Sequence, residues 1–174
     1  MQSRYLEAVI PWGKRVLRLA SLYLPNGNPV GTEKYDYKLG FMERLIRHAR
    51  KLLSYEEPLV IAGDYNVIPQ ARDAAHPEIW TGDALFLPQT RAKFQELAAL
   101  GLTDALRATS DAGGVYTFWD YQAGAWQRNN GIRIDHLMLS PQAADRLEGA
   151  TVDKGMRAKE KASDHVPVRI ALRD

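Results

Sequence analysis

Pro-Leu-Val-Ile-Ala-Gly-Asp-Tyr-Asn, at positions 58–66, is the most informative stretch of this sequence. The apolar run at 59–62 predicts a short strand that is buried on both faces. Gly63 and Asp64 interrupt this run, and Asn66 follows two positions later. A carboxylate at the end of a buried strand must be solvated, hydrogen-bonded or paired with a metal ion. Asp64 is therefore a candidate functional residue, at a strand-to-loop junction where such residues tend to lie.

Patterns on both sides of this segment predict a mixed α/β fold. Apolar residues recur at three- and four-residue spacing between 35 and 53, as in an amphipathic helix, and Lys38 falls on its polar side. Helices early in the chain and strands late in it favour a mixed sheet over a purely parallel one. The expected strands are 5–10, 16–24, 58–62, 116–121, 132–140, 150–154 and 166–173, with helices at 35–53, 89–100 and 141–147 and an irregular segment at 69–88.

Composition places the chain among ordinary globular domains. Its 174 residues are 45% hydrophobic and 25% charged, without a repeat or a Ser/Gly linker, so we expect a single domain over residues 1–174. No apolar run approaches the ~20 residues of a membrane span, and the first residues lack the apolar core of a signal peptide.

The absence of cysteine excludes a disulfide scaffold, a thiolate zinc site and a cysteine nucleophile, and a cytoplasmic setting is expected. A formal net charge of +2 is too small to indicate nucleic-acid binding by itself.

A second pair of candidate residues lies in the last third of the chain. Asp135 sits between apolar neighbours in an expected strand, and His165 directly precedes the last strand. An aspartate that orients a histidine ring fixes its tautomer and stabilises the charged imidazolium. The alternative is that Asp135 pairs with Arg133 and that His165 only caps a strand. For Asp64 and Asn66, the alternative is an ordinary turn motif at a strand end.

Motifs of several other enzyme classes are missing. The sequence has no Gly-X-Ser-X-Gly elbow, no Gly-X-X-X-X-Gly-Lys phosphate loop and no His-Glu-X-X-His zinc motif. The acidic candidates Asp64, Asp135 and Asp164, in a chain without cysteine, favour a hard cation such as Mg²⁺ or Mn²⁺ over zinc.

Five motifs, read in order, make the chain resemble a known family. They are Leu-Tyr-Leu-Pro-Asn-Gly at 22–27, Gly-Asp-Tyr-Asn-Val-Ile-Pro at 63–69, Tyr-Thr-Phe-Trp-Asp-Tyr at 116–121, Arg-Ile-Asp-His-Leu-Met-Leu-Ser at 133–140 and Ser-Asp-His-Val-Pro-Val at 163–168. Together they closely resemble the exodeoxyribonuclease III type of abasic-site endonuclease, within the endonuclease/exonuclease/phosphatase superfamily. The resemblance covers nearly the whole chain. It implies an α/β fold, a two-sheet sandwich of the pancreatic-deoxyribonuclease type.

The resemblance also implies roles for individual residues. Asp64 would orient or deprotonate the attacking water, and Asn66 would contact the phosphate. His165, held by Asp135, would contact the scissile phosphate. Tyr23 would form a hydrogen bond with the same phosphate.

Two further sets of residues follow from the same resemblance. A divalent metal ion, Mg²⁺ or Mn²⁺, would be associated with Asp64, Asn66, Asp164 and His165. The substrate would contact Asn26 and an apolar wall, because an abasic sugar is easily flipped out and small enough for a tight apolar site. The wall residues are Phe118, Trp119, Ile132 and Ile134, for which ordinary sandwich core is the alternative.

The activity implied is that of a DNA-repair nuclease. It would hydrolyse the phosphodiester 5′ to an abasic site in double-stranded DNA, and degrade DNA from 3′ ends, by metal-assisted in-line attack of water. Two alternatives stay open: a catalytically impaired fragment that binds DNA or a partner, and the same fold acting on another phosphodiester or phosphate monoester. Basic residues in expected loops, Lys14, Arg15, Arg128, Lys159 and Lys161, either contact the DNA backbone or are simply solvated.

The resemblance fails at the beginning of the chain. Family members begin with a strand that bears a Trp-Asn-Ile-Asn-like segment, followed by a strand whose Gln-Glu segment supplies the principal metal ligand. Neither segment precedes Tyr5. We therefore expect the C-terminal portion of the fold, with weakened metal binding. Uncovered apolar faces and strand edges would favour self-association in a family whose members are expected to be monomers.

Overall fold

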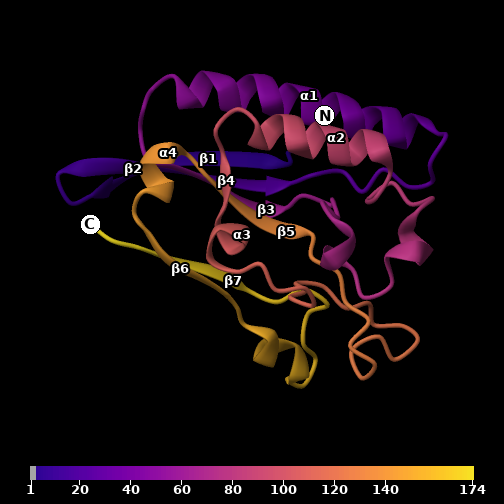
Figure 1. Cartoon of the computed structure of the whole chain (residues 1–174). Helices are drawn as coiled ribbons and strands as arrows, with labels where there is room; N and C mark the ends of the chain where they lie inside the picture. The colour runs from indigo at the N-terminus through magenta and orange to yellow at the C-terminus, as the bar shows by residue number, and fades with distance from the viewer. Residues whose placement is uncertain (1–2) are drawn as a thin grey trace.

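Two β-sheets and a layer of helices make up the fold, which the computed structural model describes for residues 3–174. The strands are β1 (Tyr5–Trp12), β2 (Arg15–Tyr23), β3 (Leu59–Asp64), β4 (Thr103–Asp104), β5 (Asp135–Leu139), β6 (Leu147–Val152) and β7 (Val168–Leu172). The helices are α1 (Glu33–Leu53), α2 (Pro88–Ala98), α3 (Ala105–Thr109) and α4 (Pro141–Ala144), with 3₁₀ turns η1 (Ala71–Asp73), η2 (Pro77–Trp80) and η3 (Lys154–Ala158). A five-stranded sheet of order β1-β2-β3-β5-β4 lies between α1 and α2 on one side and the β6-β7 sheet on the other (Figure 1). This arrangement confirms the expected two-sheet α/β fold class.

The register of the large sheet brings three of the sequence motifs together. β2 and β3 are parallel, and Tyr23 lies opposite Asp64. β5 runs antiparallel to β3, and Asp64 lies opposite Asp135. The chain leaves β2 and β3 at this end of the sheet and enters β5 at the same end. Residues from distant parts of the sequence therefore form one row across the strand ends.

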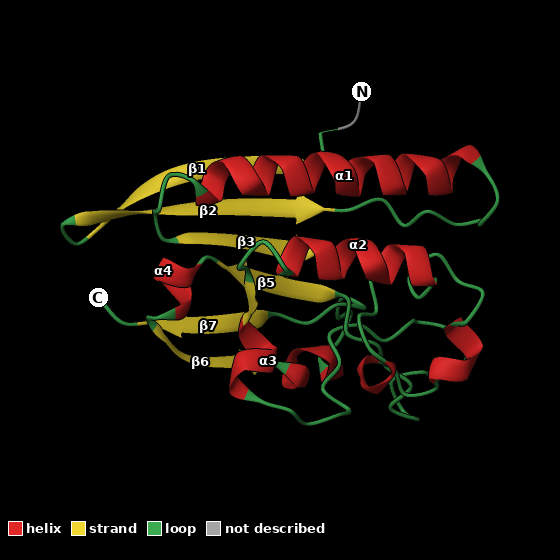
Figure 2. Cartoon of the chain, turned by 45° about the horizontal axis from the view of Figure 1, so that its top comes forward, coloured by secondary structure: helices red, strands yellow, loops and turns green. Residues whose placement is uncertain are grey.

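Helices α1 and α2 cover one face of the large sheet (Figure 2). Thr32 caps the start of α1, where its side chain accepts a hydrogen bond from a backbone N–H of the first turn. The apolar stripe of α1 buries Met42 and Leu45 in a core that also contains Ile61 of β3 and Phe94 of α2. This packing holds β3, and with it the row of strand ends. No helix within residues 3–174 combines the length and apolarity that a membrane span requires.

The other face of the large sheet is only partly covered. Val60 of β3 packs with Ile170 of β7 in a second apolar core between the two sheets. The same face continues over β1 and β2, where Leu6, Ile10 and Leu19 are 72%, 41% and 40% exposed. Apolar surface is thus exposed on β1 and β2, as the incomplete family resemblance led us to expect.

Most expected elements are present, but the segment at 116–121 is not a strand. Phe118 alone forms isolated β-bridges, one to Ile132 and one to His165. A single paired residue does not make a continuous ladder, so no strand is formed. The strand expected at 132–140 begins only at Asp135, since the preceding residues bond to loop segments instead. β4 and α3 were not expected; a two-residue strand and a five-residue helix are too short to leave a periodic pattern.

Candidate active site

The row of strand ends borders a cleft of about 320 Å³. The sequence-predicted residues that line it are Tyr23, Asn26, Asp64, Asn66, Phe118, Ile132, Ile134, Asp164 and His165. The structure therefore brings together residues from all five motifs. Asn28, Trp80, Asp83, Leu85 and Asp120 also line the cleft and were not predicted. Trp80, Asp83 and Leu85 come from the irregular segment, which carried no recognisable pattern.

Asp64 and Asn66 are joined by direct hydrogen bonds. The backbone N–H of Asn66 donates to Asp64 Oδ1 at 2.7 Å, and Asn66 Nδ2 donates to Asp64 Oδ2 at 2.9 Å. Nδ2 also donates to the carbonyl of Leu24 at 2.8 Å, so both of its hydrogens are used inside the protein. Asn66 therefore holds the Asp64 carboxylate in place. The predicted contact of its amide N–H with a phosphate requires one of these bonds to break.

Asp64 has a high pKa for an aspartate. Burial and the nearby charge of Asp135 raise the pKa of Asp64 to about 6, against the lowering effects of the Asn66 N–H, His165 and Lys38. A carboxylate whose pKa lies close to neutral pH is suited to accept a proton from water.

His165 is paired with Asp135 at this cleft. Its Nδ1 lies 2.9 Å from Oδ2 and 3.1 Å from Oδ1 of Asp135. Burial alone would lower the pKa of His165, but the hydrogen bond to Asp135 and the charges of Asp135 and Asp64 outweigh burial and raise it. The ring of Phe118 packs against the imidazole, with centroids 5.0 Å apart. The predicted Asp–His pair is present, and the alternative pairing of Asp135 with Arg133 is wrong.

An apolar wall forms another part of the cleft. Phe118, Ile132 and Ile134 line it, and they pack with Trp80 and Leu85 in a local apolar cluster. The cluster anchors the irregular segment that carries Trp80 and Leu85. Three of the four predicted wall residues thus face the cleft.

Trp119 is the exception, and its predicted place in the wall is corrected. Its side chain is 1% exposed, its ring stands edge-on to Trp126 at 5.2 Å, and its Nε1 donates to Asn129 Oδ1 at 3.3 Å. Neighbouring residues of an extended chain point to opposite sides. Because Phe118 faces the cleft, Trp119 faces the protein core.

Tyr23 and Asn26 are the exposed predicted residues of the cleft. Tyr23 is 55% exposed, and the guanidinium of Arg4 lies 4.8 Å from its ring. Asn26 Nδ2 donates to Asn66 Oδ1 at 3.2 Å, and its Oδ1 accepts the Asn28 N–H at 3.1 Å. Both side chains are accessible to a bound molecule.

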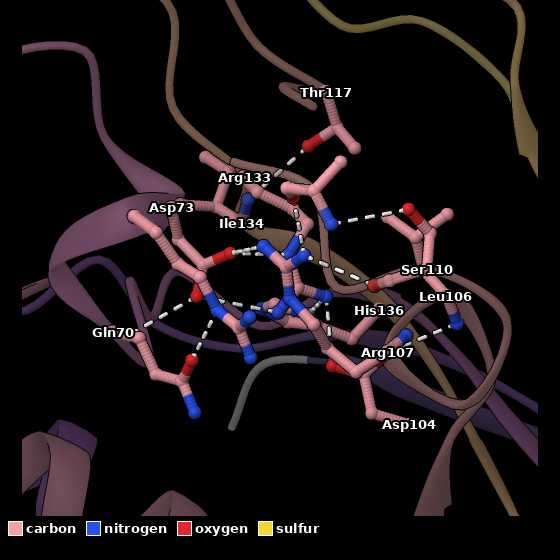
Figure 3. A network of polar contacts seen from close by, with 12 residues as sticks. Gln70, Asp73, Asp104, Leu106, Arg107, Ser110, Thr117, Arg133, Ile134 and His136 are labelled. Atoms are coloured by element: carbon pink, nitrogen blue, oxygen red, sulfur yellow. Dashed lines mark hydrogen bonds and ion pairs between the residues drawn. The ribbon is translucent and has the colours of Figure 1, made fainter. Parts of the chain in front are cut away.

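A buried ion-pair network lies beside this site (Figure 3). Arg133 is 1% exposed; its Nε donates to Asp73 Oδ1 and its Nη1 to Asp104 Oδ2, each at 2.7 Å. Burial would raise the pKa of Asp73, but Arg133 and Arg107, which also pairs with Asp73, hold that pKa below its usual value. The two aspartates stand 60 and 29 residues from Arg133, so no local pattern indicated them.

His136 connects this network to the row of strand ends. Its Nδ1 lies 2.9 Å from Arg133 Nη1, and its Nε2 lies 3.0 Å from the carbonyl oxygen of Val67. Burial and the charge of Arg133 lower the pKa of His136 to about 4, so the ring is neutral, accepts at Nδ1 and donates at Nε2. His136 follows Asp135 and Val67 follows Asn66, so the network holds both sides of the row.

The described residues do not complete a metal site. Within residues 3–174, no three His, Asp or Glu side chains are arranged so that they could hold a metal ion. Both oxygens of Asp64 accept hydrogen bonds from Asn66, and Asp164 Oδ1 accepts one from Ser163 at 3.4 Å. The predicted set, Asp64, Asn66, Asp164 and His165, lines one cleft but does not form a coordination sphere.

Solved structures of nucleases and a phosphatase share this fold. The 3′ phosphatase NExo from Neisseria, bound to a product DNA hairpin, has a TM-score of 0.93 and 34% identity, over 99% of this chain and 65% of that chain. An AP endonuclease from Archaeoglobus fulgidus has a TM-score of 0.86 and 31% identity, over 91% of this chain and 63% of that chain.

Sequence relatives agree with the structural ones. The exodeoxyribonuclease of Bacillus subtilis is 32% identical over 153 residues, which are 87% of this chain and 58% of the relative. Exodeoxyribonuclease III of Haemophilus influenzae is 31% identical over 175 residues, which are 96% of this chain and 66% of the relative. This chain thus spans less than two thirds of the length of these relatives. The profile of the Endonuclease/Exonuclease/phosphatase family matches residues 4–165. That match covers most of the chain and includes Tyr23, Asp64, Asp135 and His165. This chain therefore belongs to the endonuclease/exonuclease/phosphatase family.

Proposed function

We propose that this chain carries the hydrolytic site of a DNA-repair nuclease. The proposed reactions are cleavage of the phosphodiester 5′ to an abasic site and removal of nucleotides from 3′ ends. The observation that carries the proposal is one cleft in which Asp64, a His165–Asp135 pair and an apolar wall meet. Similar proteins include exodeoxyribonucleases, an AP endonuclease and a DNA-bound 3′ phosphatase, which supports DNA as the substrate.

Asp64 supplies the general base in this proposal. Its raised pKa allows the carboxylate to accept a proton from water near neutral pH. The water oxygen forms a bond to phosphorus while the bond from phosphorus to the sugar 3′ oxygen breaks on the opposite side, and the released 3′ oxygen takes up a proton from solvent. Asn66 keeps the Asp64 carboxylate in one orientation through two hydrogen bonds. Holding the base in one orientation raises the rate, because the reacting groups are already aligned for attack.

His165 stabilises negative charge on the phosphoryl oxygens. Asp135 binds Nδ1 and helps to raise the pKa of His165, which favours the charged imidazolium. No hydrogen bond joins Nε2 to another group within residues 3–174, so this N–H is available to a phosphoryl oxygen. A donor that is already oriented toward developing charge lowers the barrier without reorganisation.

The apolar wall supports the proposed preference for abasic sites. Phe118, Ile132 and Ile134 offer no hydrogen-bonding side-chain groups to a base edge. A sugar without a base leaves the helical stack at low cost and fits a small apolar site. We propose that these three side chains contact that sugar.

The proposal includes a divalent metal ion. Members of the family generally depend on such an ion. Asp64 and Asp164 offer carboxylate oxygens, the ligand type that Mg²⁺ and Mn²⁺ prefer, so we propose one of these two ions. The described side chains do not complete its site, and the groups that act in the proposed hydrolysis are Asp64, Asn66 and His165.

The test is cleavage of a labelled DNA duplex that carries one abasic-site analogue. The chain is incubated with Mg²⁺, with Mn²⁺ and with EDTA, beside an intact duplex and a duplex that ends in a 3′ phosphate. Incision 5′ to the lesion with Mg²⁺ or Mn²⁺ supports the proposal. Release of phosphate without incision would instead identify a phosphate monoester as the substrate.

A second candidate function is DNA binding without turnover. The incomplete set of metal-binding side chains favours it. Fluorescence anisotropy with the same abasic duplex distinguishes the two. Tight binding of the duplex by a folded chain that gives no product under any of the metal conditions would select the second function.

The rate of incision should depend on pH through Asp64. An acid is deprotonated above its pKa, so the fraction of Asp64 able to act as base rises as pH increases through about 6. We expect the rate to fall about tenfold for each pH unit below that value. A pH series of initial rates on the abasic duplex checks this. A rate that stays constant from pH 5 to pH 8 contradicts the assignment of Asp64 as base.

A further inference from the structure

Lys38 is a fully buried lysine next to the cleft. It lies on α1 and is 0% exposed, although its place on the helix predicted a solvent-facing side chain. Its Nζ donates to the carbonyl of Asn26 at 2.9 Å and to the carbonyl of Asn66 at 2.6 Å. One ammonium group thus joins the loop after β2 to the loop after β3. These two loops carry the asparagines that line the cleft.

A lysine in this position is costly. Its hydrogen-bond partners within residues 3–174 are two carbonyl oxygens rather than a carboxylate. Burial lowers the pKa of Lys38 to about 7, and the charges of Asp83 and Asp64 oppose that lowering only in part. An apolar side chain of similar volume often stabilises a protein core as well as a buried charge does, or better. Stability alone is therefore a poor reason for a lysine here.

The surrounding backbone is fitted closely to the stem of this lysine. Gly27 has φ +90°, and a Cβ at that position would lie 2.6 Å from Lys38 Cδ. The loop can pass over the lysine only because Gly27 has no side chain. The stem of Lys38 and the backbone of Gly27 therefore lie close together beside the carbonyl of Asn26.

We propose that Lys38 is a positioning residue, whose ammonium group holds the backbone of Asn26 and Asn66 and so keeps Asp64 correctly oriented. The route is short: Asn26 Nδ2 donates to Asn66 Oδ1, and Asn66 donates twice to Asp64. The effect on turnover rests on the proposed function. The effect on the two asparagines does not.

The first test compares Lys38→Met with Lys51→Met, which removes an exposed lysine from the same helix. We expect Lys38→Met to lower kcat about 10²-fold, because a catalytic group displaced by about 1 Å loses that much. Affinity for the abasic duplex, measured by anisotropy, should stay close to that of the unmodified chain. Lys51→Met should behave like the unmodified chain in both measurements.

A second measurement does not depend on activity. NMR of the side-chain amides of Asn26 and Asn66 should show shifted signals and faster hydrogen exchange in Lys38→Met, and no change in Lys51→Met. If the unmodified chain gives no incision, the proposed function fails, and these amide signals still decide about Lys38. Signals and kcat that both match those of the unmodified chain would overturn the proposal.

Chemical rescue separates the hydrogen-bonding amino group from the volume of the side chain. The chain has no cysteine, so Lys38→Cys introduces a single thiol that can be alkylated in the unfolded state before refolding. An S-aminoethyl adduct restores an ammonium group, whereas an S-propyl adduct of nearly the same size does not. We expect only the charged adduct to regain kcat and the amide signals. Equal recovery by the two adducts would overturn the proposal. The proposal would also be overturned if the charged adduct folds and the neutral adduct does not, because that result assigns Lys38 to folding.

Discussion

Replacing Asp64 by asparagine should lower the rate of incision at an abasic site by about 10²–10⁴-fold, the range that general base catalysis contributes. The substitution keeps the shape of the side chain and removes its ability to accept a proton from water. It also disturbs one contact, because the new amide has a single oxygen for the two Asn66 donors, the backbone N–H and Nδ2, that bond to Asp64. Single-turnover rates on the labelled duplex, at pH 8 and saturating enzyme, isolate the chemical step from binding.

The same variant should not be less stable than the unmodified chain. The charged form of Asp64 is disfavoured by burial and by Asp135, which is why its pKa is raised. A neutral asparagine removes that unfavourable charge, so the melting temperature at pH 8 should be equal or higher. Loss of activity without loss of stability is typical of a residue retained for function.

Asp120→Asn is the matched control. Asp120 lines the same cleft, and the substitution removes the same charge, but within residues 3–174 its Oδ1 accepts a hydrogen bond only from the nearby N–H of Gln122. Its rate should stay close to that of the unmodified chain. If both variants lose activity equally, the effect comes from the charge of the cleft and Asp64 is not the base. Near-normal incision by Asp64→Asn would contradict its role outright.

The row of strand ends could be predicted because each of its members belongs to a local pattern. Asp64 interrupts an apolar run, and Asp135 lies within another. The antiparallel register of β3 and β5, which no local pattern gives, places these two residues opposite each other at one end of the sheet. The residues alone left open whether Asp135 pairs with His165 or with Arg133; the family resemblance implied His165, and the structure shows that contact at 2.9 Å.

Other features depend on tertiary contacts that leave no local pattern. Phe118 and Trp119 are adjacent aromatic residues, and only the path of an irregular segment decides which of them faces the cleft. Lys38 lies on the polar side of its helix, yet the loop containing Gly27 covers it. Asp73 lies in a stretch without periodicity and meets its partner 60 residues later.

Arg133→Met should destabilise the protein by about 3–5 kcal/mol, the usual loss when one member of a buried ion pair is removed. Asp73 is 0% exposed, and among the described residues it would keep only the partly exposed Arg107 as an ion-pair partner without Arg133. Asp104 loses its 2.7 Å contact as well. Both carboxylates then stay buried with fewer donors, or take up protons at a cost. Urea unfolding monitored by tryptophan fluorescence measures the loss.

Arg169→Met is the matched control for the stability loss expected of Arg133→Met. Arg169 pairs with Asp153 at 2.5 Å, closer than the 2.7 Å contacts of Arg133, but its side chain is 65% exposed. Exposed pairs contribute about 0–1 kcal/mol because water screens them and solvates either partner alone. The same arginine-to-methionine change should therefore cost several times more at 133 than at 169. Arg133→Lys should fall between, because an ammonium keeps the charge but cannot contact Asp73 and Asp104 with separate, fixed donors. Equal losses at the two arginines would mean that burial does not govern these pairs, and the network would then have no special part in holding Val67 and Asp135 beside the cleft.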